Sequence, residues 1–326
     1  MKLATLKDGT PDGRLLVVAR DLSRAVIAAS VAPTLQQAVE TWANSEPKLQ
    51  GLYRDINEGH AAGSFPLELA QLSSPLPRAW QWLVACAFHS HVERLGKLLT
   101  PAPLEGRSVP LMYQGAGDDF LGPADEVPLA SEDDGMDFEA GFGVVVDRVS
   151  QGTSAAADAH IKLVVLINGW SLRALAEREA GTGFGFLQSR PATSFAPTAV
   201  TPDELGHAWS EGRVRLPVHV YRNEHEVGHP DGAQMDFSFG QLVAHAARTR
   251  NLGAGTVIGS GAVSNEAHRE VGTACIAELR AIELAEQGAP RTGYLAHGDR
   301  VRIDVLDEGH SVFGAIDQCV VPTRLP

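Results

Sequence analysis

The chain has 326 residues, of which 44% are hydrophobic and 21% charged, a composition typical of a globular protein rather than a disordered one. Forty acidic against 27 basic residues give a formal net charge of −13, which disfavours nucleic acids and anionic membrane surfaces as partners. The three cysteines are widely spaced and form no disulfide framework, and no apolar run suggests a signal or membrane segment. We therefore expect a cytoplasmic protein that binds neither nucleic acid nor membrane.

The first 75 residues are expected to form a small α/β domain. Short alternating apolar runs predict strands at residues 2–6, 15–19 and 25–29, and a helical pattern follows over residues 34–57. The segment 74–77 has two prolines in three residues and therefore cannot continue a helix. We place the boundary there, which predicts domains at 1–75 and 76–326.

Strand-like runs between turn signals dominate the rest of the chain and predict a β-rich core with a few inserted helices. These runs are at residues 141–149, 161–167, 213–221, 256–259, 300–305 and 311–321. Thr201, Pro202 and Glu204 have the pattern of a helix start, with a cap, a first-turn proline and a reciprocal glutamate. An apolar stripe over residues 239–251, followed by Gly253, predicts another helix.

One acidic motif, Asp137-Phe138-Glu139-Ala140-Gly141, points to a possible cation site. Side chains alternate along a strand, so two carboxylates at positions 139 and 141 would face the same way and could hold Mg²⁺ or Ca²⁺. Position 141 is glycine, which leaves Glu139 alone. The residues themselves leave two interpretations open, namely a carboxylate entering a β core or a solvated glutamate at a strand edge.

Ordered motifs extend from Pro75 to Val321, namely Asp118–Pro123, Asp137–Glu139, Asn168–Ser171, Phe186–Arg190, residues 255–265 and Gly298–Val301. With these motifs the chain resembles the fumarylacetoacetate hydrolase family, whose members cleave a carbon-carbon bond in acylpyruvates and related β-dicarbonyl compounds. The resemblance implies an α+β fold, in which a mixed β-sandwich roll follows a small N-terminal α/β domain. It also implies a homodimer, a small-molecule substrate and a divalent cation at one mouth of the roll.

The resemblance assigns roles to individual residues. His91 falls on the position of a general base for water and Glu278 on that of its carboxylate partner. Arg190 replaces the family's lysine, which steadies developing negative charge, and Ala262 replaces a threonine that grips the substrate carboxylate. Three further residues of the same motifs are expected at the substrate, namely Gln188, Trp170 and Ser260.

The metal-ligand positions depart from the family pattern. Of four acidic positions only Glu139 keeps its carboxylate, while the others are Val84, Gly141 and Gly169. Because Mg²⁺ and Ca²⁺ need several oxygen ligands, we expect no tightly held cofactor, and at most weak binding of either ion. Loss of the ion would remove a Lewis acid worth several kcal/mol of barrier. Ordinary acylpyruvate hydrolysis should then be slow unless Arg190 and other donors take over that role.

Two functions remain open. In the first, His91 and Glu278 drive carbon-carbon cleavage, or decarboxylation, isomerisation or cyclisation, of a small β-dicarbonyl substrate without the usual metal. In the second, the chain is a catalytically silent family member that binds a ligand or partner. A pocket in which His91, Glu278 and Arg190 converge would favour chemistry, whereas a pocket filled by Val84 or Trp170 would favour the silent binder.

Three other patterns have simpler explanations. The glycines of residues 253–261 follow a helix and enter a strand, the reverse of the order in a phosphate-binding loop. Cys275 lies in an apolar segment and is expected to fill the core. A zinc set could be drawn from one polar segment, but that segment has the composition of an exposed hairpin loop. Its candidate ligands are His219, His225, His229 and Asp231.

Overall fold

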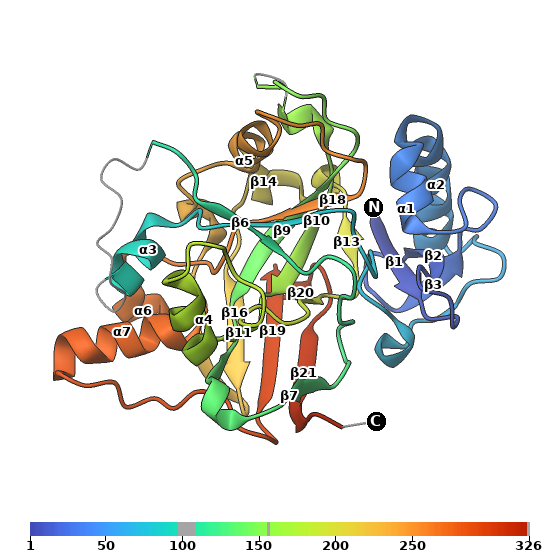
Figure 1. Ribbon diagram of the computed structural model, residues 1–326. Coiled ribbons are helices and arrows are strands. Elements are labelled where there is room, and N and C mark those ends of the chain that lie inside the picture. Colours follow the sequence, from blue (N-terminus) through green and yellow to red (C-terminus); the bar gives the residue numbers. More distant parts are fainter. Residues whose placement is uncertain (97–107, 155–156, 325–326) are drawn as a thin grey trace.

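The computed structural model describes residues 1–96, 108–154 and 157–324 and has two principal β-sheets (Figure 1). The larger sheet has the order β4-β3-β2-β1-β13-β10-β9-β18-β5-β6, with β12 beside β10. Its strands are β1 (Lys2–Leu6), β2 (Arg14–Val18), β3 (Arg24–Ile27), β4 (Phe65–Pro66), β5 (Trp82–Ala85), β6 (Met112–Gly115), β9 (Ala140–Val146), β10 (Ile161–Asn168), β12 (Ser194–Phe195), β13 (Ala199–Val200) and β18 (Thr256–Gly259).

The smaller sheet has the order β17-β16-β19-β21-β7, with β20 beside β19. Its strands are β7 (Val127–Leu129), β16 (Val218–Arg222), β17 (His225–Gly228), β19 (Arg300–Asp307), β20 (His310–Ser311) and β21 (Ile316–Pro322). Two short ribbons pair β8 (Met136–Asp137) with β11 (Ser171–Leu172) and β14 (Trp209–Ser210) with β15 (Arg213–Val214). The expected α+β class with a mixed β-roll is confirmed.

The α-helices of the described residues are α1 (Leu35–Glu40), α2 (Trp42–Asn57), α3 (His89–Gly96), α4 (Arg173–Ala180), α5 (Phe239–Ala246), α6 (His268–Val271) and α7 (Ile276–Gln287). Helices α1 and α2 pack on the N-terminal strands, while α3, α4, α6 and α7 gather on the far side of the molecule (Figure 1). None of the helices in the described ranges is long and apolar enough to cross a membrane.

The N-terminal strands extend the large sheet instead of forming a sheet of their own. Strand β1 pairs antiparallel with β13, with Lys2 opposite Val200. Near this junction the large sheet is covered on both faces. Val144 and Val164 belong to the core cluster shared with the smaller sheet, whereas Val145 and Val165 belong to the cluster under α1 and α2. Burial on both faces explains why β9 and β10 have continuous apolar sequences, since no face needs polar residues.

A helix begins after Thr201 as predicted, with Pro202 in its first turn, but the predicted capping contacts are absent. The segment is a 3₁₀-helix, η4 (Pro202–Ala208), broken at Gly206, and the Thr201 hydroxyl caps none of its amides. That hydroxyl instead accepts a hydrogen bond from the amino group of Met1 at 2.6 Å. The carboxylate of Glu204 accepts one from Tyr53, also at 2.6 Å. The Thr201 hydroxyl and the Glu204 carboxylate, which the capping pattern assigns to the helix start, thus form hydrogen bonds with residues far away in the sequence.

Other element boundaries also differ from the prediction. The helix predicted over 34–57 is interrupted at Thr41, and the helix predicted over 239–251 already ends at Ala246. The strand predicted over 213–221 is divided into β15 and β16, with Pro217 between them, because proline cannot donate to the ladder. Gly314, with a φ of 78°, lies between β20 and β21, which divides the run at 311–321.

Candidate functional site

The acidic motif at residues 137–139 connects the large sheet to helix α7. Both oxygens of Asp137 accept backbone amides at the start of α7, from Ile276 at 2.7 Å and from Ala277 at 2.9 Å. This places Glu278 in the first turn of α7, facing the interior. Two residues along the chain from Asp137, the amide of Glu139 donates to Asn168 Oδ1 at 3.0 Å. The motif therefore positions two carboxylates of the site, one through the helix and one directly.

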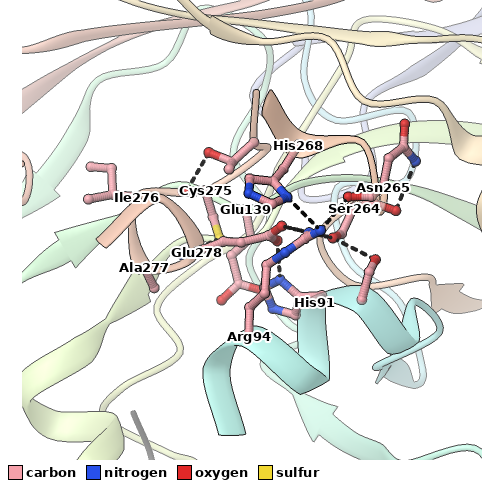
Figure 2. A network of polar contacts seen from close by, with 12 residues as sticks. His91, Arg94, Glu139, Ser264, Asn265, His268, Cys275, Ile276, Ala277 and Glu278 are labelled. Atoms are coloured by element: carbon pink, nitrogen blue, oxygen red, sulfur yellow. Dashed lines mark hydrogen bonds and ion pairs between the residues drawn. The ribbon is translucent and has the colours of Figure 1, made fainter. Parts of the chain in front are cut away.

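His91 and Glu278 form a buried pair between α3 and α7 (Figure 2). His91 Nδ1 lies 2.8 Å from Glu278 Oε2, and the two side chains are 9% and 1% exposed. The other oxygen of Glu278 accepts from Ser264 at 2.8 Å and contacts the guanidinium of Arg94. Burial alone would raise the pKa of Glu278, but the hydrogen bond and charge of His91, with Arg94, hold that pKa below its ordinary value.

An ionised carboxylate on Nδ1 determines which nitrogen of His91 can act as a base. Glu278 accepts a hydrogen bond from the proton-bearing Nδ1 of His91, so the neutral ring presents Nε2 as its basic atom. The same carboxylate stabilises the ring once it is protonated. Geometrically this is a base with its orienting acid.

Glu139 forms a second cluster, with arginine side chains. Its Oε1 lies 2.6 Å from Arg190 Nη1 and 3.0 Å from Arg173 Nη2, and it accepts from the Ser171 hydroxyl at 2.5 Å. Burial would raise the pKa of Glu139, yet Arg190 and Arg173, with a further contribution from His91, hold this pKa well below its usual range.

This donor set does not fit a divalent cation at the position where the family holds one. Glu139 is already neutralised by two guanidinium groups, which would repel a second cation at the same oxygen. The backbone excludes a restored acid at position 141, because a Cβ on Gly141 would lie 2.3 Å from the carbonyl oxygen of Gly261. Position 169 is open, since a Cβ there would be 3.8 Å from Glu139.

A small pocket, with a cavity volume of about 20 Å³, lies beside the Glu139 cluster. It brings together Glu139, Arg190, Val84 and Trp170, whereas His91 and Glu278 are not among its lining residues. Aromatic and small residues make up much of its remaining wall, among them Trp82, Tyr113, Gly115, Thr193 and Gly261. His91, Glu278 and Arg190 therefore do not all converge on this pocket, in which Arg190 lies together with Val84 and Trp170, the residues that we associated with a silent binder.

The other expected substrate residues are placed away from this pocket lining. Gln188 is exposed, and its side-chain oxygen accepts from Arg178 at 2.7 Å. Ser260 is buried and donates to the carbonyl of Gly261 at 2.7 Å. Ala262 packs with Cys275 and Ala277 in a small buried cluster.

The sequence analysis did not identify Arg173 and Arg94 as residues of the site. Arg173 starts helix α4 and also contacts Asp137, with Nε 2.9 Å and Nη2 2.8 Å from one carboxylate oxygen. Arg94 lies one helical turn after His91, a spacing that places both on one face of α3. That spacing was a usable signal for Arg94, whereas Arg173 is brought to the site only by the pairing of β11 with β8.

Cys275 contributes to the packing beside the site. Cys275 is fully buried, and burial, the largest cause, raises the pKa of its thiol well above the ordinary value. A thiol that stays protonated is a poor nucleophile. The expectation that Cys275 fills the core is confirmed.

Comparison with known proteins identifies two matching domain families. The description "Fumarylacetoacetate (FAA) hydrolase C-terminal" matches residues 81–321, and "Fumarylacetoacetase N-terminal domain 2" matches residues 1–78. No curated protein matches the chain.

Several solved structures share the fold. The fumarylacetoacetate hydrolase of Exiguobacterium antarcticum is 16% identical with a TM-score of 0.67, covering 99% of this chain and 100% of its own. A maleylpyruvate hydrolase from a Sphingobium species, solved with manganese and pyruvate, is 16% identical with a TM-score of 0.65 and the same coverage. A 5-carboxymethyl-2-hydroxymuconate delta-isomerase from Mycobacterium smegmatis is 16% identical with a TM-score of 0.61, and both chains are fully covered. The chain belongs to the fumarylacetoacetate hydrolase family.

Proposed function

We propose that this chain is an enzyme that acts on a small acylpyruvate-type substrate, with the guanidinium groups of Arg173 and Arg190 in place of the family's divalent cation. The observation that carries the proposal is the buried contact of both arginines with Glu139, at 3.0 and 2.6 Å, beside the pocket. Burying several charges costs free energy that an apolar core would avoid, and such clusters with perturbed pKa values are typical of active sites.

Arg190 supplies the anion-binding group. It lines the pocket, and within the described ranges its buried Nε atom has no hydrogen-bond partner. A guanidinium with a spare donor suits a carboxylate or an enolate oxygen, because such charge-assisted hydrogen bonds are strong. Its plane is supported by Tyr113 and Phe186, whose ring centroids lie 4.9 and 5.3 Å from Arg190 Cζ. These contacts favour a small anionic substrate.

In the hydrolytic form of the reaction, His91 Nε2 takes a proton from water while the water oxygen attacks the acyl carbonyl carbon. The bond between that carbon and the methylene carbon then breaks, and its electron pair becomes the enolate of pyruvate. Arg190 and Arg173 stabilise this negative charge, as donors fixed in advance of the reaction can do. Protonation of the methylene carbon by His91 completes the balance, with one water consumed and a carboxylic acid and pyruvate formed.

The same residues could serve isomerisation, decarboxylation or cyclisation of a β-dicarbonyl, because each of these reactions begins or ends with proton transfer at carbon next to a stabilised enolate. Solved structures of the same fold include both hydrolases and isomerases by name. The second candidate is a silent ligand-binding member. It is favoured by the pocket lining, where Val84 and Trp170 stand and His91 does not.

Turnover of a panel of acylpyruvates, with pyruvate release measured in the presence of chelator, tests the proposal. We expect turnover by the parent protein and a fall of about 10²-fold or more in His91→Ala, the usual scale for loss of a general base. His89→Ala is the matched control, since His89 lies on the same helix, pairs with Asp236 at 3.2 Å and should leave the rate unchanged. Absence of turnover or isomerisation for every member of the panel would refute the enzyme and favour the silent binder.

A further inference from the structure

A second group of potential metal ligands lies on the hairpin of β16 and β17, in the smaller sheet. His219 Nδ1 is 3.4 Å and His229 Nδ1 is 3.1 Å from the same oxygen, Glu226 Oε1. The two imidazole rings are stacked, with centroids 5.7 Å apart and planes inclined by 27°. The three ligand atoms all lie within 4.8 Å of one another.

The structure changes which residues of this hairpin belong together. His225 Nδ1 lies 2.8 Å from the carbonyl of Asn223, and Asp231 accepts the amide of Ala233 at 2.7 Å, so both are used locally. Glu226, which the spacing of histidines did not suggest, occupies the centre instead. His219 comes from β16, whereas Glu226 and His229 come from β17 and the residue just after it.

We propose that His219, Glu226 and His229 bind a divalent late transition-metal ion such as Zn²⁺. Zinc held by imidazole and carboxylate at 2.0–2.1 Å in a tetrahedron requires ligand atoms about 3.3 Å apart. The two nitrogen-to-oxygen separations, 3.1 and 3.4 Å, bracket that value. Two imidazoles and one carboxylate suit Zn²⁺ and its neighbours, whereas Mg²⁺ and Ca²⁺ require more oxygen ligands.

The backbone holds the three ligands in place before any ion arrives. Tyr221 pairs with Glu226 in the hairpin register, and the amide of His229 donates to the carbonyl of Val271 at 2.7 Å. All three side chains reach solvent, with exposed fractions of 22%, 43% and 40% for His219, Glu226 and His229, so an ion can enter directly. Three ligands leave a fourth position for water. The ion would fasten β16 to the end of β17, a structural role separate from the Glu139 cluster.

Titration of tag-free, chelator-treated protein with Zn²⁺ by calorimetry tests this site, and Co²⁺ gives a second readout through its visible absorption. We expect one ion per chain at this site, with affinity reduced by about 100-fold or more in His219→Ala and in His229→Ala, since even outer-shell changes cost 10- to 100-fold. His225→Ala, on the same hairpin, is the matched control and should bind as the parent does. Each variant is first checked for an unchanged unfolding temperature in chelator.

A buried cluster of His91, Cys275 and Glu278 is the competing place for zinc. His91→Ala therefore completes the design, and it should retain the hairpin ion. The proposal is overturned if the parent binds no Zn²⁺, if all three hairpin variants bind equally, or if only His91→Ala loses the ion. Glu226 and its histidines would then be joined by hydrogen bonds alone. The outcome of this zinc titration does not depend on whether the chain turns over an acylpyruvate.

Discussion

Replacing Glu139 by glutamine should expose the cost of two buried arginines without their shared counter-charge. In the parent, Oε1 lies 2.6 Å from Arg190 and 3.0 Å from Arg173. Arg173 keeps a second carboxylate, Asp137, at 2.8 Å, so Arg190 is the group left without an acidic partner. Removing one member of a buried ion pair costs about 3–5 kcal/mol, and we expect a loss of unfolding free energy of about 3 kcal/mol or more.

Urea unfolding in chelator at neutral pH measures this loss. Glu177→Gln, an exposed position on the same helix as Arg173, should change the stability by less than about 0.5 kcal/mol. The pH dependence has a defined sign, because Arg190 and Arg173 hold the pKa of folded Glu139 below its unfolded value. The stabilisation is therefore complete above the unfolded pKa of about 4.3 and is lost as pH falls through the folded pKa. A loss below about 1 kcal/mol, or one seen only when divalent cation is added, would refute the paired-arginine interpretation.

Four further results are expected. Gly141→Ala should lower the free energy of unfolding by about 1–3 kcal/mol in urea, because its Cβ would lie 2.3 Å from a backbone oxygen; an unchanged stability would count against this geometry. The double variant Val84→Glu with Gly169→Asp should fold and bind Mn²⁺ more tightly than the parent in an electron paramagnetic resonance titration, and an equal affinity would count against it. Burial lowers the pKa of Lys2 to about 8 in the folded chain, so the unfolded chain binds that proton more tightly than the folded chain does. The free energy of unfolding should therefore rise between about pH 8 and 10, and Lys2→Met should abolish this rise. Light scattering should give twice the chain mass of 34.7 kDa, as a homodimer requires, and a stable single-chain mass would contradict that proposal.

The sequence predicted those parts of the molecule that depend on local pattern or on ordered motifs. The continuous apolar runs of β9 and β10 were recognisable because both faces of the sheet are buried there. The family motifs led to His91 and Glu278, which the structure places 2.8 Å apart. Their catalytic roles remain proposals.

What could not be predicted depends on contacts between distant segments. Thr201 has a good capping pattern, but its hydroxyl contacts Met1, and no local rule reveals this competition. Arg173 reaches Glu139 only because β11 pairs with β8, so the second guanidinium was invisible in the sequence. Glycine at position 141 appeared as a lost ligand, yet the structure shows that the nearby carbonyl of Gly261 leaves no room for any side chain.

The most direct test of the central claim compares turnover of an acylpyruvate by metal-free protein with turnover after Mg²⁺ or Mn²⁺ is added. If Arg173 and Arg190 replace the cation, the rate in chelator should equal the rate with added ion, and it should fall by about 10²-fold or more in His91→Ala. Elemental analysis of the same sample should find no tightly held Mg²⁺, Mn²⁺ or Ca²⁺. A rate that appears only with added ion and is unchanged in His91→Ala would contradict both the replacement of the cation and the role of the histidine.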